Sequence, residues 1–147
     1  MKKIFTLSLL AITAAFVMVG CSRSSGGYDG GFDEGYWLSK ERGEVVYSDS
    51  YCSYYVVETN YGYNIVQAYS GYKPYEGSMV YGNFSSRGTR DMYNRTTGYV
   101  FTGTVTDYWL TYDEAQDALD YYCPVGGKGE AVTKRVFKAS SFKTQTK

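Results

Sequence analysis

Catalytic chemistry has little support in the residue types of this chain of 147 residues, which contains no histidine. Without an imidazole, Ser-His-Asp and Cys-His catalysis and histidine-based metal sites are excluded. No acidic loop has the spacing of an EF-hand, and no glycine-rich loop opens a helix after a strand. The carboxylates are scattered along the sequence, and a solvated surface explains them best. We therefore predict no catalytic residue, no metal ligand and no cofactor.

Binding by aromatic and basic side chains is the chemistry that remains. The chain has 18 tyrosines, and exposed aromatic patches mark interaction sites. Aromatic rings with nearby cationic side chains are typical of surfaces that bind a glycan, peptidoglycan or an anionic lipid headgroup. The alternative is that the tyrosines pack a small β core and the arginines pair with carboxylates. The candidate ligand-binding residues are Tyr72, Tyr75, Tyr81, Arg90, Tyr93 and Arg95.

The first 20 residues have the pattern of an export signal. Lys2 and Lys3 form a positive start, and the apolar run from Ile4 to Val19 follows. This run is shorter than the ~20 apolar residues that span a membrane, and no stop-transfer pattern follows it. We therefore expect residues 1–20 to be a signal peptide that is removed.

The end of this signal, Met18-Val19-Gly20-Cys21, resembles the lipobox of bacterial lipoproteins, in which the cysteine is acylated and becomes the new N-terminus. The resemblance implies a lipid anchor at Cys21, and several acyl chains there give stable membrane binding. The alternative is an ordinary secretory signal. Ser22 is not the acidic residue that retains some lipoproteins at the inner membrane. We therefore expect an anchor in the outer membrane, with the protein facing the periplasm.

The length of the remaining chain favours one domain, and its charge disfavours binding to nucleic acid. Once Lys2 and Lys3 are removed, 13 basic residues remain against 15 acidic ones. A small negative net charge provides no field that attracts nucleic acid. The 126 residues after Cys21 suffice for one modest core.

The two remaining cysteines, Cys52 and Cys123, predict a disulfide. An oxidising envelope favours pairing of an even number of cysteines, although two separate buried thiols are the alternative. The bridge would close a loop of 70 residues and attach the expected helix to the sheet. By the chain-entropy model, such a loop stabilises the fold by ~4 kcal/mol.

Composition divides the chain after the signal into three parts. Residues 21–35 are rich in Ser and Gly, which is typical of a flexible tether. Residues 36–124 form the expected β domain. Residues 125–147 form a basic tail that we expect to be mostly disordered, with a late edge strand as the alternative before about Ala139.

The β domain is expected to be mainly β, a small antiparallel barrel or sandwich of OB or SH3-like size with six or seven strands. The clearest hairpin, Ser53–Thr59 with Tyr63–Tyr69, is apolar on both faces, which is typical of a strand covered on both faces or of a barrel wall covered by a helix. Gly103, in the longest segment, favours a bend or bulge. The other expected strands are Tyr36–Leu38, Glu44–Tyr47, Met79–Phe84, Thr89–Asn94 and Tyr99–Trp109.

A helix over residues 112–122 is the best-specified element. Thr111 and Glu114 have the spacing of a capping box, and Pro124 ends the pattern. Apolar residues recur at helical spacing from Ala115 to Tyr122 and form one face.

Several segments of the chain look like small Tyr-rich envelope lipoproteins of unassigned function. These are the lipobox, Tyr36–Gly43, Tyr81–Phe84, Tyr93–Thr96 and Asp107 through Cys123. The resemblance implies a compact β domain on a lipid anchor and transfers no catalytic residue. Two functions follow as expectations: a non-enzymatic module that binds glycan, peptidoglycan or another envelope component through a Tyr-rich face, or an inhibitor or accessory subunit that docks a partner protein through an edge strand.

Overall fold

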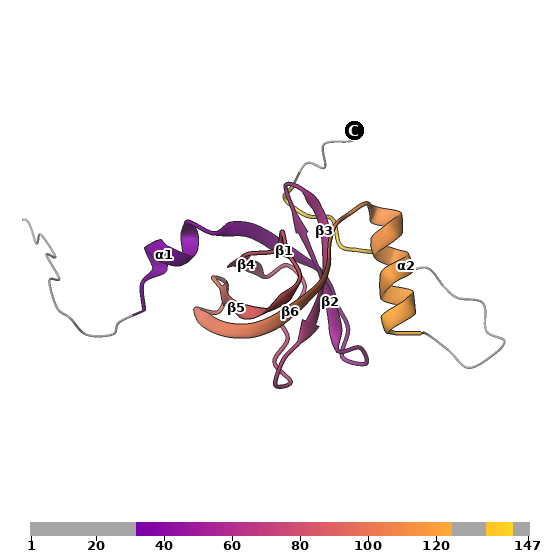
Figure 1. The fold of residues 1–147 in the computed structure, drawn as a ribbon, viewed down its shortest axis with the longest axis horizontal. Helices are drawn as coiled ribbons and strands as arrows, with labels where there is room; N and C mark the ends of the chain where they lie inside the picture. The colour runs from indigo at the N-terminus through magenta and orange to yellow at the C-terminus, as the bar shows by residue number, and fades with distance from the viewer. Residues whose placement is uncertain (1–31, 125–134, 143–147) are drawn as a thin grey trace, which may run out of the picture. The chain divides into compact units, whose positions relative to one another are not determined.

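The computed structural model describes residues 32–124 and 135–142. The expected signal peptide, Cys21 and most of the expected tether lie outside these residues. Along the chain, the elements are α1 (Glu34–Leu38), β1 (Glu41–Ser48), β2 (Tyr54–Thr59), β3 (Gly62–Ala68), β4 (Met79–Gly82), β5 (Gly88–Asn94), β6 (Tyr99–Leu110) and α2 (Tyr112–Tyr122), as Figure 1 shows.

The six strands close into a barrel in the order β1-β2-β3-β6-β5-β4, and every neighbouring pair is antiparallel. The barrel consists of two three-stranded meanders, β1 to β3 and β4 to β6, which pair with each other along both sides. The expectation of a small, mainly β, antiparallel barrel with a C-terminal helix is thereby confirmed.

The barrel interior is filled by one buried apolar cluster: Val45, Tyr55, Val57, Val66, Val80, Phe84, Met92, Phe101 and Val105. Gly103 on β6 belongs to this packing, because a Cβ there would lie 2.9 Å from Val66 Cγ1 and 3.0 Å from the Tyr55 hydroxyl. The expected bulge lies elsewhere, since the register of β6 shifts between Val105 and Leu110. Gly103 is therefore needed for close packing inside the barrel.

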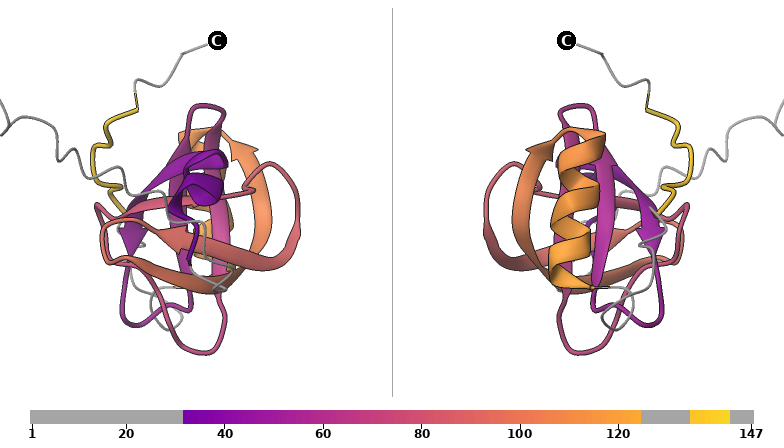
Figure 2. Two further views of the ribbon diagram at one scale, coloured as in Figure 1. Left: turned by 90° about the vertical axis from the view of Figure 1, so that its left-hand side faces the viewer. Right: turned by 90° about the vertical axis from the view of Figure 1, so that its right-hand side faces the viewer.

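Helix α2 lies against the outside of the barrel wall (Figure 2, right), and a second apolar cluster lies under it. Its buried members are Val46, Tyr47, Cys52, Val56, Tyr63, Ile65, Ala115, Leu119 and Phe137. Consecutive residues on the strands therefore belong to opposite clusters: Val56 packs outward and Val57 packs inward. This arrangement confirms the prediction, from the two-sided hydrophobicity of the hairpin, of a barrel wall covered by a helix.

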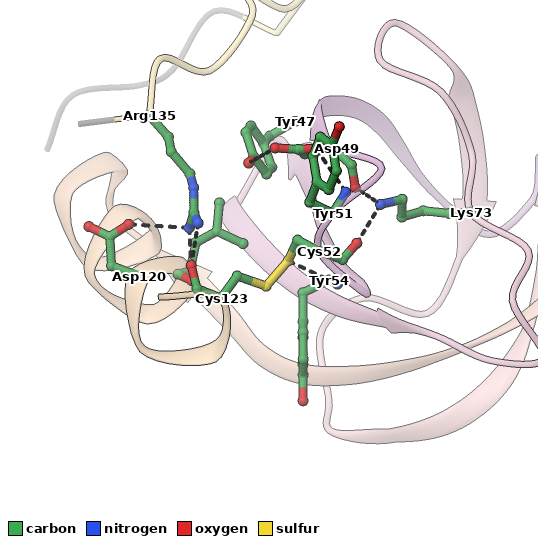
Figure 3. Close-up of a disulfide and its surroundings, with 10 residues drawn as sticks. Tyr47, Asp49, Tyr51, Cys52, Tyr54, Lys73, Asp120, Cys123 and Arg135 are labelled. Carbon is green, nitrogen blue, oxygen red and sulfur yellow. Dashed lines mark hydrogen bonds and ion pairs between the residues drawn. A yellow bond between two sulfur atoms is a disulfide. The ribbon is translucent and has the colours of Figure 1, made fainter. Parts of the chain in front are cut away.

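The predicted helix and its attachment are confirmed. In α2 the Thr111 hydroxyl accepts from the Glu114 backbone N–H at 3.3 Å, and Glu114 Oε2 accepts from the Thr111 N–H at 2.8 Å, so the capping box is complete. A disulfide joins Cys52 to Cys123, which follows the last turn of α2 (Figure 3). The helix is thus fixed to the segment before β2 by a covalent bond as well as by packing.

The expected strand at Tyr36–Leu38 is wrong, because residues 34–38 form the short helix α1. Asp33 causes the difference, since its Oδ1 accepts from the Tyr36 backbone N–H at 3.1 Å and caps the helix. The end of the expected tether, up to residue 35, therefore belongs to this helix. The strand expected over Glu44–Tyr47 is longer than predicted, since β1 already begins at Glu41.

Residues 135–142, here called the C-terminal strap and yellow in Figure 1, are the part of the expected tail that the structure describes, and residues 125–134 and 143–147 lie outside the described residues. Phe137 is buried in the outer cluster, and the Lys138 backbone N–H donates to the Val46 carbonyl at 2.8 Å. Glu44 Oε2 accepts from the Ser141 N–H and hydroxyl at 2.9 and 2.8 Å. Burial of Phe137, together with hydrogen bonds to β1, thus holds in place a segment whose composition alone favours disorder.

Candidate functional site

The predicted ligand-binding tyrosines do not form one surface. Tyr81 and Tyr93 face each other on β4 and β5, but only 7% and 4% of their surfaces are exposed. Helix α1 covers Tyr93, whose hydroxyl donates to Glu34 Oε1 at 3.3 Å and whose ring lies 6.2 Å from that of Trp37. These two tyrosines therefore belong to the packing of the fold and expose little ring surface to a ligand.

The predicted arginines are occupied by structural contacts. Arg90 donates to the backbone carbonyls of Asn83 at 3.0 Å and Arg87 at 2.6 Å. It does so because β4 ends at Gly82 and leaves the carbonyls of the following loop without strand partners. Arg95 is exposed and forms an ion pair with Glu34 at 3.5 Å.

Tyr72 and Tyr75 remain accessible but lie in different surroundings. The Tyr72 ring lies 5.2 Å from that of Phe101, and its hydroxyl accepts from Asn94 Nδ2 at 3.2 Å. Tyr75 is 78% exposed. Tyr72 lines an aromatic groove whose other residues the sequence did not single out. Tyr81 and Arg95 line a separate hollow with Arg42, and Arg90 lines a third beside Tyr36 and Trp37.

Two aromatic regions, at opposite ends of β6, stand out instead. The first, here called the Trp109 site, comprises Tyr61, Trp109, Glu41, Ser85 and the hollow beside them. The second, here called the Tyr99 groove, is lined by Tyr69, Ser70, Tyr72, Tyr99, Val100, Phe101 and Thr102.

In the Trp109 site, two large rings stand exposed side by side. Trp109 and Tyr61 are 54% and 66% exposed, and their rings lie 5.9 Å apart. The Trp109 ring is held in place by its Nε1–H, which donates to Ser85 Oγ at 3.1 Å. Fixed, exposed aromatic rings are typical of surfaces that bind a ligand.

The backbone of Trp109 is strained in a way that places its ring at the surface. Its φ is +60°, a conformation that side-chain-bearing residues rarely adopt. The buried Asn64 supports it, because Asn64 Oδ1 accepts from the Trp109 N–H at 3.3 Å while Asn64 Nδ2 donates to the Val57 carbonyl at 3.0 Å. Gly62 leaves room for this approach, since a Cβ there would lie 2.7 Å from the Leu110 carbonyl oxygen.

This placement explains why alternation along β6 mispredicts Trp109. Strict alternation puts Trp109 on the same face as Phe101 and Val105, which point into the barrel. The register between β3 and β6 shifts between Val105 and Asp107 and again between Asp107 and Leu110. Trp109 lies within the second irregularity, where the alternation of faces is interrupted. A sequence signal does exist in Asn64, a polar residue inside an otherwise apolar strand.

Beside the two rings lies a polar hollow of about 510 Å³, lined by Ser39, Lys40, Glu41, Arg42, Asn60, Tyr61 and Ser85. Glu41 Oε2 accepts from the Ser85 hydroxyl at 2.8 Å and from the Phe84 N–H at 3.1 Å. The other carboxylate oxygen, Oε1, is buried and has no hydrogen-bond partner among the described residues. The hollow thus combines a carboxylate, an amide, hydroxyls and cations next to an aromatic wall.

The Tyr99 groove, of about 480 Å³, has a different lining that includes no charged side chain. It opens where β3 ends at Ala68, opposite Gly103, whereas β6 continues to Tyr99. Ser70 and Gly71, with φ of +56° and +80°, turn the chain away from β6 at this point.

The titration behaviour of the described residues has structural causes. Burial raises the pKa of Tyr55, and a hydrogen bond to Asp107 raises that of Tyr122. Burial lowers the pKa of Lys73, whose ammonium donates to the carbonyls of Asp49 and Cys52 (Figure 3). These groups hold loops and helices in place, and their shifts do not assign them to a reaction.

Residues 32–124 and 135–142 contain no group of three or more histidines, cysteines and carboxylates placed to hold a metal ion. Within the same residues, every helix is too short or too polar to cross a bilayer. Comparison with known proteins gives no match: no family model, no curated protein sequence and no solved structure is similar to this chain.

Proposed function

We propose that this chain is a lipid-anchored, non-enzymatic module of a bacterial envelope that binds a glycan, with peptidoglycan as the first candidate, at the Trp109 site. The observation that carries the proposal is the exposed pair of Tyr61 and Trp109 rings beside a polar hollow, with the Trp109 indole held by Ser85. This pair replaces the tyrosine face that the sequence predicted.

The chemistry of the site matches that of a sugar. One face of a pyranose ring presents C–H groups, which pack on an aromatic ring, while its hydroxyls require hydrogen-bond partners around the edge. Trp109 supplies the aromatic wall, and Glu41, Asn60 and Lys40 supply acceptors and donors along the hollow. Ligand sites commonly combine an aromatic wall with a few convergent polar groups in this way.

Rigidity favours binding at this site. The Trp109 indole is held by Ser85, and its backbone is held by Asn64, so little side-chain freedom remains to be lost when a ligand binds. A strained backbone that the surrounding structure maintains is also typical of functional positions.

The sequence supports a proposal for the position of this protein in the cell. We propose that Cys21 carries the lipid and that the domain faces the periplasm from the outer membrane, which places the Trp109 site within reach of the cell wall. Metabolic labelling with a fatty acid is expected to tag the wild-type chain and not the Cys21→Ser variant. Equal labelling of the two chains would contradict the anchor.

Binding is tested by co-sedimentation of the purified mature protein with peptidoglycan sacculi. Wild-type protein is expected to sediment with sacculi, and Trp109→Ala is expected to reduce the affinity at least ~10-fold, as for a central aromatic contact. Tyr51→Ala is the matched control, because Tyr51 is 98% exposed and lies outside the site. Failure of the wild type to bind, or equal binding by Trp109→Ala, would overturn the proposal.

A further inference from the structure

The Tyr99 groove contains an open strand edge. The ladder between β5 and β6 runs from Gly88↔Val105 to Asn94↔Tyr99, whereas the ladder between β3 and β6 ends at Ala68↔Gly103. Residues Tyr99–Thr102 therefore pair with β5 on one side only. Among the described residues, no backbone hydrogen bond outside the β5 ladder reaches these four residues.

This edge is open because the segment that follows β3 leaves the barrel wall. Ser70 and Gly71 adopt positive φ and direct the chain out of the barrel wall directly after β3. Tyr72 then returns to cover Phe101 at the mouth of the barrel, with its ring 5.2 Å from that of Phe101. The space between this loop and β6 is the Tyr99 groove.

We propose that the Tyr99 groove binds an extended peptide segment of a partner protein, which adds to β6 as an antiparallel strand in the line of β3. Backbone groups along a strand alternate in direction, so about two of the four residues Tyr99–Thr102 present N–H and C=O groups to the groove. An extended peptide is the ligand whose own backbone satisfies such a row of groups. The open length, four residues at ~3.3 Å each, fits a short strand of about the same length.

The side chains around the edge specify the chemistry of that peptide. Tyr69 and Tyr99 are 54% and 66% exposed, Val100 is 43% exposed, and the lining includes no charged side chain. Peptide side chains that point toward this lining must therefore be apolar, whereas those on the other face of the added strand meet solvent. The preferred segment alternates apolar and polar residues and carries no charge on its buried face.

The open edge is measurable in the free protein by amide hydrogen exchange. Amides of β6 from Gly103 to Leu110 that bond to β3 are expected to be protected, whereas at least one amide among Tyr99–Thr102 exchanges at the rate of an exposed loop. Protection of all four amides equal to that of the β3-paired residues would overturn the proposal.

The occupant is tested with a blocked hexapeptide, Thr-Val-Thr-Val-Thr-Val, titrated into the purified mature protein and followed by amide chemical shifts. Two further probes carry N-methyl groups on alternate amides, one set on the odd residues and one on the even residues. Strand addition predicts shifts at Tyr99–Thr102, a loss of affinity of at least 10-fold for one methylated probe, and unchanged affinity for the other. Equal affinities of the two methylated probes, or no shifts with the parent peptide at millimolar concentration, would overturn the proposal.

Protein variants separate this site from the Trp109 site. Tyr69→Ala removes one wall of the groove and is expected to weaken the parent peptide at least 10-fold, whereas Tyr121→Ala, which changes a residue 81% exposed on α2, leaves it unchanged. Trp109→Ala is expected to leave peptide binding unchanged, because it lies at the other end of β6. Loss of peptide binding in Trp109→Ala, or unchanged binding in Tyr69→Ala, would contradict a site at the Tyr99 groove.

Discussion

The tyrosines under α2 and those near the two ends of β6 differ in what covers them. Under α2, Tyr63 is 8% exposed, and the rings of Tyr54 and Tyr122 stack at 4.4 Å. At the two ends of β6, Tyr61 and Tyr99 are each 66% exposed. The same residue type thus seals a helix against the barrel in one region and forms open aromatic surface in the other.

This difference indicates that the tyrosines of this chain have two physical roles. A buried tyrosine contributes apolar area to the fold while its hydroxyl finds a polar partner, as Tyr122 does with Asp107 at 2.8 Å. An exposed tyrosine contributes little to stability and leaves its ring available to a ligand. Changes in the covered region should therefore lower stability, and changes in the open regions should lower binding.

The largest effect is expected when the covalent attachment of the covered region is removed. Replacing Cys52 and Cys123 together by Ser is expected to lower the free energy of unfolding by ~4 kcal/mol, because the bridge spans a sequence separation of 71. Urea unfolding of the oxidised wild type and the double variant measures the difference. An unchanged unfolding midpoint would show that packing alone holds α2.

A smaller loss is expected from the packing of α2 itself. Leu119 is fully buried in the outer cluster, so Leu119→Ala is expected to cost ~3 kcal/mol in unfolding free energy. Tyr121→Ala, on the exposed face of the same helix, is expected to stay within ~0.5 kcal/mol of the wild type. Equal losses in the two variants would contradict the view that only the residues covered by α2 contribute to stability.

The start of α2 provides a still smaller effect. Thr111→Ala removes the hydroxyl that accepts from the Glu114 N–H and is expected to cost ~1 kcal/mol. Thr111→Ser keeps this acceptor and is expected to restore most of the loss in thermal unfolding. If Ser and Ala variants unfold at the same temperature, the capping box does not contribute to the stability of α2.

The smallest effect is expected in the pH dependence of stability, through the titration of Tyr122 at the end of α2. The hydrogen bond to Asp107 raises the pKa of Tyr122 above its ordinary value of 10.0. Because the folded state holds this proton more tightly than the unfolded state, the contribution is complete below pH 10.0 and is lost as the pH rises through the folded-state pKa. In urea unfolding at alkaline pH, Tyr122→Phe is expected to show a shallower decline than the wild type, and an identical decline would exclude Tyr122 as its source.

Local signals in the sequence predict much of this fold. The capping box at Thr111 and Glu114 places α2 at residues 112–122, and the hairpin signal at Asn60 to Gly62 places β2 and β3. These features depend on residues two or three positions apart, so the sequence pattern alone contains them. The two-sided hydrophobicity of the hairpin also predicts a covered barrel wall, because consecutive apolar residues in a strand require a partner on each face.

The binding surfaces depend on contacts between distant residues, which the sequence pattern does not contain. The sequence predicts Tyr81 and Tyr93 at the surface, but α1 covers Tyr93. Alternation places Trp109 on the inward face, but the irregularity between Asp107 and Leu110 places its ring at the surface. Phe137 orders the C-terminal strap only because a site for it exists between Tyr47 and Tyr112. The candidate glycan site therefore emerges from the structure, while the expectation of an aromatic binding surface comes from composition.

The fluorescence of Trp109 reports most closely on glycan binding at the Trp109 site. The chain has two tryptophans, so in the Trp37→Phe variant all indole emission comes from Trp109. Titration of this variant with soluble peptidoglycan glycan fragments is expected to give a saturable change in emission that Glu41→Gln weakens, since Glu41 lines the hollow beside the ring. Emission that stays constant while the same protein binds sacculi would contradict the claim, because the glycan would then bind elsewhere.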